Sequence, residues 1–409
     1  MAFETQGFGL VPGEIRTVTL GDGRFGSKFF MLHIALKMLM GDRAKYVMLV
    51  SGLTFATLLM TQQNAIFQGL LRWTTSHMRN MRASIWVVEA RVIQVNETKA
   101  LRDTDVNRVR SVKSVDFAVP LYQGILKARS AEGSDKILQV IGLDRASLVG
   151  RPAVILQGNL ADLRVPNSVF IDELAVERLS AGRAKPLGLG DSFEINDREA
   201  RIVGICRTER HFFGYPYVFC TYDQALLFAP RQRKMLSMIL AEPAAGWTPE
   251  AAAREIERQT GLKAFTVPEF TKSTVDWVFR ETGIAFSFLT TIILGFIVGV
   301  AVAGQTFYSF VLENLRHLGA LKAMGASAWL LAQMLLVQAF TVGLIGYGLG
   351  VGLTALFGYL VLPIGQPPFF LEASSLIKSL GAVLAICTFA ALLGIRRVAR
   401  LEAAVVFRN

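Results

Sequence analysis

The sequence predicts an α-helical membrane protein with four transmembrane helices and an α+β extracytoplasmic domain between helices 1 and 2. Two observations predict this fold class. First, 52% of the 409 residues are hydrophobic and 18% are charged, whereas about 25% charged residues are usual in a soluble protein. Second, the apolar residues gather in long uncharged runs, and a helix needs about 20 apolar residues to cross a bilayer. A block of mixed polarity, residues 72–283, separates the first run from the others.

The uncharged runs place the four transmembrane helices at residues 46–71, 284–312, 328–362 and 376–395. The third run requires a choice, because Ala328 to Leu371 would extend about 66 Å as one helix, which is enough for two spans. Both ends of the chain are rich in Lys and Arg, and cytoplasmic flanks favour these residues, so an even number of spans is expected. Prolines from Pro363 onward end a helix near residue 362. We therefore predict one span followed by an outer loop at residues 363–375.

The two ends of the chain are predicted to lie in the cytoplasm. Residues 1–45 form the N-terminal part, and within it Phe29–Met40 is apolar but too short to span, as in an interfacial helix. The first 27 residues lack the apolar core of a cleavable signal peptide, so we expect the first span to act as an uncleaved anchor. The tail, residues 396–409, is arginine-rich.

The block at residues 72–283 is long enough to bury a core of its own. Its β-branched runs predict strands at residues 84–95, 115–121, 124–129, 136–143 and 167–171, and a hairpin around Asn196-Asp197. Helices are predicted at residues 103–112, 172–179 and 249–260, the last with Thr248 as its N-cap. Helices at residues 73–81 and 271–280 are expected to continue into spans one and two, so that movement of the spans moves the outer domain.

The three cysteines leave one question open. Cys387 lies in the last span, whereas Cys206 and Cys220 fall in the outer block. These two residues form a disulfide if the compartment is oxidising. Alternatively, they are buried free thiols that pack as small apolar residues.

Glycines spaced four residues apart predict close packing of the transmembrane helices. The pairs are Gly295 and Gly299 in the second span, and Gly346 with Gly350 and Gly348 with Gly352 in the third.

Several kinds of site are not expected. Gly21–Lys28 is glycine-rich, but Ser27 and Lys28 stand in the reverse order of a phosphate-binding loop. The histidines lack metal-ligand spacing, and no catalytic constellation is identified, so we predict no metal site, no catalytic residues and no enzymatic activity. The span centres are uncharged, which argues against an ion pathway. The net charge of +11 is attributed to basic residues that set the orientation of the spans and attract anionic membrane lipids. No nucleic-acid binding is expected.

The segment at residues 313–327 is amphipathic, weakly basic and enclosed by two long uncharged runs. A polar helix between two spans lies at the bilayer face, where it can contact a partner in water and move both spans. The segment resembles the signature E-R-x-R-E-I-G-x-L-K/R-A-x-G-A of the FtsX-like permease family, which includes the MacB-type and lipoprotein-releasing transporters. The matching residues are Glu313, Arg316, Gly319, Leu321, Lys322, Ala323, Gly325 and Ala326, whereas Asn314 and His317 replace charged residues.

Other segments extend the resemblance. The tail at residues 396–408 looks like the ending of this family without its proline. Residues 166–173 and 190–196 look like a MacB-like periplasmic core, and residues 55–60 look most like the DevC-type branch.

The resemblance implies the permease subunit of an ABC exporter in the bacterial inner (plasma) membrane, with both termini cytoplasmic. It implies a separate ABC ATPase that binds ATP and Mg²⁺, while the permease binds no cofactor directly. The implied ATPase-coupling residues are Glu313, Leu315, Arg316, Leu318, Gly319, Leu321, Lys322, Ala323, Gly325 and Ala326. Further implied partners are a second copy of the chain in a homodimer, a periplasmic membrane-fusion adaptor and an outer-membrane channel.

Three functions are compatible with these features. The leading hypothesis is a permease that transmits motion from the ATPase to its periplasmic domain in an adaptor-linked export or efflux system. The alternatives are an FtsX-like regulator that activates a periplasmic cell-wall hydrolase, and a lipid or lipoprotein extractor. The size of the outer block favours the larger MacB/DevC type.

Overall fold

The computed structural model describes residues 34–130 and 132–399. The Gly21–Lys28 segment, the start of Phe29–Met40 and the tail from residue 400 lie outside the described residues. The chain divides into two compact units. One comprises the described parts of Met1–Leu59 and Ile377–Asn409 together with Leu294–Leu353, and the other comprises Met60–Ile293 and Thr354–Leu376.

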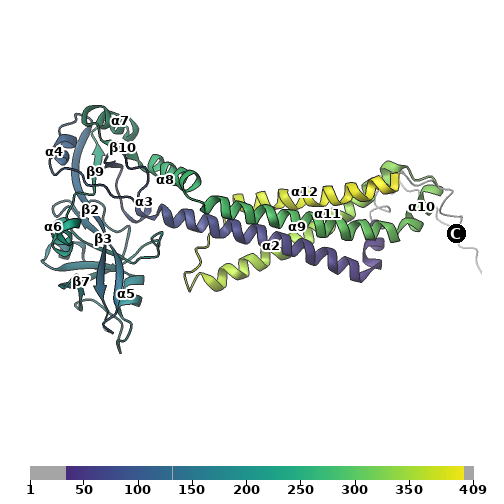
Figure 1. Ribbon diagram of the computed structural model, residues 1–409, viewed down its shortest axis with the longest axis horizontal. Coiled ribbons are helices and arrows are strands. Elements are labelled where there is room, and N and C mark those ends of the chain that lie inside the picture. The colour runs from purple at the N-terminus through teal and green to yellow at the C-terminus, as the bar shows by residue number, and fades with distance from the viewer. Residues whose placement is uncertain (1–33, 131, 400–409) are drawn as a thin grey trace, which may run out of the picture. The chain divides into compact units, whose positions relative to one another are not determined.

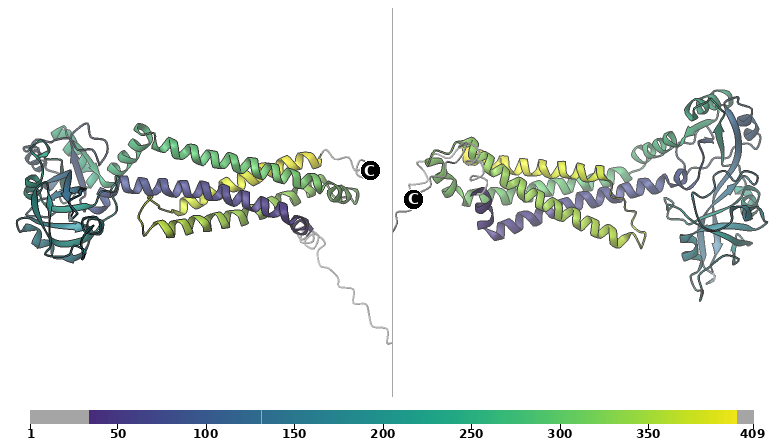
Figure 2. Two further views of the ribbon diagram at one scale, coloured as in Figure 1. Left: turned by 60° about the horizontal axis from the view of Figure 1, so that its bottom comes forward. Right: turned by 180° about the vertical axis from the view of Figure 1, so that it is seen from behind.

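Within the part of the chain that the structure describes, four helices are long and apolar enough to cross a membrane, which agrees with the number of predicted spans. They are α2 (Arg43–Thr74), α9 (Ile284–Glu313), α11 (Ala328–Val361) and α12 (Ala373–Ala399). Figure 1 and Figure 2 show that these four helices run alongside one another. α11 ends two residues before Pro363, as expected from the bias of residues preceding proline against helical conformation. A loop of residues 362–372 then leads to α12.

A short helix at residues 34–41 precedes α2 and is distinct from it. Asp42 separates the two, and its carboxylate accepts a hydrogen bond from the backbone N–H of Lys45 at 3.2 Å. The buried side-chain amide of Gln338, on α11, donates to the carbonyl of Ala35 at 2.7 Å. This bond fastens the short helix to the third span.

Glycines allow the spans to approach one another closely. A Cβ added to Gly350 would lie 2.6 Å from the Cβ of Thr57 on α2, and one on Gly346 would lie 2.8 Å from the Cβ of Leu53. A Cβ on Gly299 would lie 2.8 Å from the Cβ of Ala56. Any larger side chain at these three positions would therefore push two helices apart.

The other predicted packing glycines have different surroundings. Gly295 is buried one turn before Gly299 on α9. A Cβ on Gly348 or Gly352 would meet no described atom within 4 Å, so these two glycines lie on an open face of α11. A contact that the spacing did not predict is made by Gly343, which lies directly against the thiol of Cys387 on α12.

The outer domain is built on a ten-stranded sheet in the order β10-β1-β9-β2-β3-β8-β5-β7-β4, with β6 pairing with β2 and β7. The strands are β1 (Ile85–Val88), β2 (Val115–Arg129), β3 (Asp135–Leu143), β4 (Val154–Gly158), β5 (Ser168–Asp172), β6 (Ser192–Ile195), β7 (Arg198–Arg207), β8 (Tyr217–Thr221), β9 (Met238–Pro243) and β10 (Lys263–Thr266). The long strand β2 pairs with β9 along its first half and with β3 along its second half. It therefore joins the two halves of the sheet.

Helices cover both halves of this sheet. They are α3 (Ser76–Asn80), α4 (Asp105–Arg110), α5 (Glu173–Leu179), α6 (Tyr222–Phe228), α7 (Pro249–Thr260) and α8 (Val267–Glu281), with 3₁₀ turns at η1 (Leu160–Arg164) and η2 (Arg231–Arg233). In Figure 1, α4 and α7 lie beside β9 and β10, where Val109 and Ile256 enter a core with Val87. A second core gathers Ala175 of α5 and Ala225 of α6 against Val140. These layers confirm the predicted α+β domain.

Local sequence signals account for several elements. The hydroxyl of Thr248 accepts a hydrogen bond from Ala251 N–H and caps α7, which begins and ends at the predicted residues. Asn196 and Asp197 have φ angles of 45° and 61°, which is the left-handed pair of a type I′ hairpin turn.

The predicted strand at residues 84–95 is wrong beyond Val88. The chain turns there, because the N–H of Val92 donates to the carbonyl of Glu89 at 3.0 Å. Val92 and Val95 are still buried, but they belong to a loop that packs on the central core. Apolar composition predicted their burial correctly and their conformation incorrectly.

The predicted continuity of the outer helices with the spans is also wrong in detail. α2 is separated from α3 by Thr75 alone, but α8 ends at Glu281 and Thr282 is extended, with φ −114° and ψ 144°. Phe67 of α2 bridges this second break. Its ring centroid lies 5.5 Å from that of Phe279 on α8 and 5.3 Å from that of Phe288 on α9.

Cys206 and Cys220, both in described strands, are buried free thiols and form no disulfide. They lie on β7 and β8, which β5 separates in the sheet. Their sulfur atoms face different carbonyls, those of Ile171 at 3.5 Å and Ile141 at 3.8 Å.

The glycine contacts predict a position-specific cost for adding one methyl group. Gly350→Ala should lower the free energy of unfolding by about 1–3 kcal/mol, because the methyl overpacks the contact with Thr57. Gly352→Ala is the matched control, and it should leave stability unchanged or raise it, since alanine favours helix. The measurement is the thermal unfolding midpoint of the purified chain in detergent. Equal midpoints for the two variants would contradict the packing.

The outer-domain core predicts a second contrast. Leu240→Ala removes a side chain that is fully buried in β9 and should cost about 2–5 kcal/mol. Leu227→Ala, at a leucine that is 46% exposed on α6, should cost well under about 1 kcal/mol. Urea unfolding followed by tryptophan fluorescence, to which the buried Trp86 contributes, measures both. A small loss for Leu240→Ala would mean that the core is not organised around β9.

Candidate coupling site between α9 and α11

The segment between the second and third spans folds as a separate short helix, α10 (Leu315–Ala323). α9 ends at Glu313, and the side-chain amide of Asn314 donates to the carbonyl of Phe310 at 2.9 Å. The backbone N–H of Asn314 donates to the same carbonyl at 3.2 Å, so Asn314 contacts the end of α9 through both its main chain and its side chain. Asn314, one of the residues that departs from the family-like pattern, therefore lies at the junction between α9 and α10.

A Schellman motif ends α10. The N–H of Ala326 donates to the carbonyl of Leu321 at 3.0 Å, and the N–H of Gly325 donates to that of Lys322 at 3.1 Å. Gly325 has φ 98°, a conformation that glycine adopts without a Cβ penalty. Ser327 then starts α11, because its hydroxyl accepts a hydrogen bond from Leu330 N–H at 3.2 Å. The Gly-Ala-Ser sequence therefore stops one helix and starts the next.

The predicted coupling residues lie on α10 and directly beside it, and they differ in how far they are buried. Leu318 and Gly319 are buried. Half-buried positions are Leu315, Leu321, Lys322 and Ala326, and exposed positions are Glu313, Arg316, Ala323 and Gly325. α10 therefore has one face against its own unit and another face open to a partner.

The open face combines charge with apolar surface. Arg316 and His317 on α10 are exposed, Met324 directly after α10 is 77% exposed, and Trp329 in the first turn of α11 is 69% exposed. Arginine, methionine and tryptophan are enriched at the cores of protein interfaces. The exposed apolar residues Met324 and Trp329 were not among the predicted site residues, although their position next to the signature could have indicated them.

A charge pair ties the start of the coupling segment to the first span. Glu313 forms an ion pair with Lys45 of α2, and Lys45 also pairs with Asp42 at 3.0 Å. Hydrogen bonds from Lys45 hold the pKa of Asp42 below its usual value. Nothing in the spacing of the sequence indicated Lys45, because its partner lies far along the chain.

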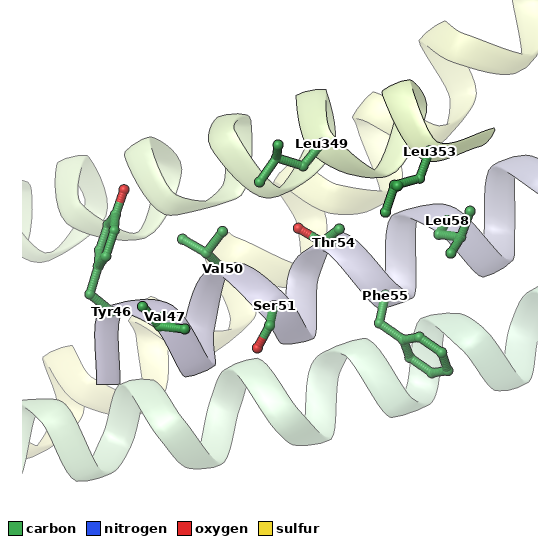
Figure 3. A pocket seen from close by; sticks show the side chains of 9 residues that line it. All are labelled: Tyr46, Val47, Val50, Ser51, Thr54, Phe55, Leu58, Leu349 and Leu353. Carbon is green, nitrogen blue, oxygen red and sulfur yellow. The ribbon is translucent and has the colours of Figure 1, made fainter. Parts of the chain in front are cut away.

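An apolar groove lies between α2 and α11 in the same unit. Figure 3 shows its lining, which encloses about 350 Å³ and consists of Tyr46, Val47, Val50, Ser51, Thr54, Phe55, Leu58, Leu349 and Leu353. The hydroxyl of Ser51 donates to the carbonyl of Met48 at 3.0 Å. The residues that line the groove include no carboxylate and no basic side chain. The groove is therefore suited to binding aliphatic chains and not to acid–base catalysis. Within residues 34–130 and 132–399, no group of three or more His, Cys, Asp or Glu residues could hold a metal ion.

Two family models match the chain. Residues 47–259 match the MacB-like periplasmic core domain, and residues 286–403 match the FtsX-like permease C-terminal domain. The Macrolide export ATP-binding/permease protein MacB of Sodalis glossinidius (strain morsitans) is 23% identical over 386 residues, which cover 89% of this chain and 57% of that relative. The chain thus spans little more than half the length of this relative.

Two solved structures are similar to the outer domain. The extracellular domain of the noncanonic ABC-type transporter YknZ from Gram-positive bacteria is 14% identical, with a TM-score of 0.33, over 45% of this chain and 99% of that one. The periplasmic region of MacB from Actinobacillus actinomycetemcomitans is 13% identical, with a TM-score of 0.34, over 48% of this chain and 94% of that one. The two matching family models together cover the outer domain and the spans, and the chain belongs to the family of FtsX-like, MacB-type ABC transporter permeases.

Proposed function

We propose that this chain is the permease subunit of an ABC exporter and transmits the motion of a separate ATPase to its own periplasmic domain. The observation that carries the proposal is the construction of α10. This helix buries Leu318 and Gly319 against its own unit and exposes Arg316 and Met324. A partner docked on the exposed face would act on α9 and α11 through their direct connections to α10.

The ion pair between Glu313 and Lys45 adds the first span to this linkage. α2, α9 and α11 would then respond together to a force on the coupling segment. Close contacts at Gly299, Gly346 and Gly350 leave the helices little room to move separately. Because α2 leads to α3, and α9 follows α8 in the sequence, the motion would reach the outer domain along the chain itself.

The spans themselves favour transmission over passage of a polar substrate. α9 carries no charged residue before Glu313, and α11 carries none. Polar substrates and ions usually need charged or polar groups within a membrane pathway. The proposed system therefore comprises a homodimer of this permease and an ABC ATPase that holds ATP and Mg²⁺. It also comprises a periplasmic membrane-fusion adaptor joined to an outer-membrane channel, with both permease termini in the cytoplasm.

A photo-crosslinker at position 324 should capture the ATPase. Replacing Met324, which is 77% exposed beside α10, by benzoylphenylalanine in intact cells should give an adduct that mass spectrometry identifies as an ABC ATPase. The same probe at Trp247, which is 43% exposed in the outer domain, is the control and should give no such adduct. An ATPase adduct from position 247 but not from position 324 would refute both the docking site and the orientation.

Reversing charge on α10 should weaken the same complex. Arg316→Glu combined with Lys322→Glu should raise the dissociation constant for the ATPase by about tenfold or more, since each lost charge contact at an interface is unfavourable by about 1 kcal/mol or more. Stimulated ATP hydrolysis should fall in parallel. Arg183→Glu with Lys185→Glu, at exposed outer-domain positions, makes the same charge change and should have no effect. Undiminished affinity in the α10 variant would exclude this surface as the coupling contact.

A further inference from the structure

We propose that the outer ends of α2 and α11 form a binding site for the phosphate group of an anionic phospholipid. The site is a cavity of about 300 Å³ within the unit that comprises Met60–Ile293 and Thr354–Leu376. Its walls come from three segments: the end of α2, the loop that follows β7, and the loop that joins α11 to α12 in Figure 1. This site is independent of ATPase docking on α10.

The cavity has an excess of positive charge. Arg72 and Arg210 line it together with the carboxylate of Glu209. That carboxylate is already engaged, because Arg72 Nε donates to it at 3.1 Å and Arg79 Nε donates to it at 2.6 Å. Burial raises the pKa of Glu209, but the hydrogen bonds from these two arginines outweigh burial and hold the pKa below its usual value.

Arg210 lines the same cavity, and no described residue supplies a matching anion for it. Among the described residues it has neither a hydrogen bond nor an ion pair, although it is half-buried. Arg210 interacts electrostatically with Asp172. The oxygens of Asp172 are occupied by the N–H of Ala175 at 2.7 Å, the N–H of Tyr217 at 2.9 Å and the hydroxyl of Thr208 at 2.8 Å. A phosphate oxygen would supply the acceptor that the planar guanidinium fits best.

The walls of the cavity are held in place without the ligand. The backbone N–H of Phe370 donates to the carbonyl of Ala65 on α2 at 3.0 Å, and the guanidinium carbon of Arg72 lies 4.5 Å above the Phe370 ring. On the other side, Asn80 exchanges two hydrogen bonds of 2.7 Å with the backbone of Glu209. The cavity is therefore a preformed site rather than a gap between mobile loops.

Apolar surface beside the arginines selects a lipid over a soluble phosphate compound. Leu362 is 62% exposed, Ile364 is 70% exposed and Tyr359 is 76% exposed at the end of α11. Trp73 also lines the cavity, and tryptophan is typical of the membrane–water interface. A phosphate on Arg210 would leave its acyl chains next to these side chains, which water would otherwise have to cover.

Native mass spectrometry of the full chain in detergent tests the site with two lipids that have the same acyl chains. Phosphatidylglycerol should occupy the wild-type protein at a concentration about five- to tenfold lower than phosphatidylcholine. Arg210→Gln should abolish this preference without breaking an ion pair. Arg183→Gln, at an exposed arginine away from the cavity, should retain it. Equal retention of the two lipids by the wild type would overturn the proposal irrespective of the variants.

Two further outcomes also decide the question. Displacement of phosphatidylglycerol by millimolar inorganic phosphate would assign the cavity to a soluble phosphate compound instead of a lipid. A parallel loss of preference in Arg183→Gln would show that total charge, and not this cavity, attracts the lipid. The expected result is no displacement and a loss confined to Arg210→Gln.

Discussion

The hydrocarbon interior of a membrane provides no hydrogen-bond partners, and this constraint decides where the chain keeps its polar chemistry. Charge is absent from α9 before Glu313 and from the whole of α11. Charged groups are therefore concentrated at helix ends, on α10 and in the outer domain. Two ion pairs lie at the ends of the spans, Glu313 with Lys45 and Glu209 with Arg72. Because the bilayer interior excludes charged groups from the spans, the two ends of the spans are the places where polar partners can bind.

Contact between the spans depends on the absence of side chains as much as on their presence. Gly346 and Gly350 bring α11 against α2, whereas Gly348 and Gly352 face open space. Both pairs have the same spacing in the sequence. Residues two apart lie on roughly opposite faces of a helix at 3.6 residues per turn, so only one pair can face α2. The other pair leaves an accessible face beside the groove between α2 and α11, next to Leu349 and Leu353.

Sequence patterns predicted the features that depend on residues close together in the chain. The uncharged runs located the spans, Thr248 located the start of α7, and Asn196-Asp197 located a hairpin turn. Long-range contacts could not be predicted, because no periodicity indicates that Glu209 meets Arg72 or that Glu313 meets Lys45. Val92 and Val95 differ from both groups. Their apolar character predicted that they are buried, but they lie in a loop and not in the predicted strand.

The extended residue Thr282 gives the chain a joint of a particular kind. A break in a helix normally allows the two pieces to separate and to swivel. Here Phe67 touches Phe279 before the break and Phe288 after it, in a small core with Val278 and Ala285. Apolar contacts resist separation, and the edge-to-face arrangement of Phe67 and Phe279, with an interplanar angle of 90°, also favours one orientation of the rings. The joint should therefore transmit a push or a pull along the chain, and the ring contacts of Phe67 should restrict how far the two helices rotate about Thr282.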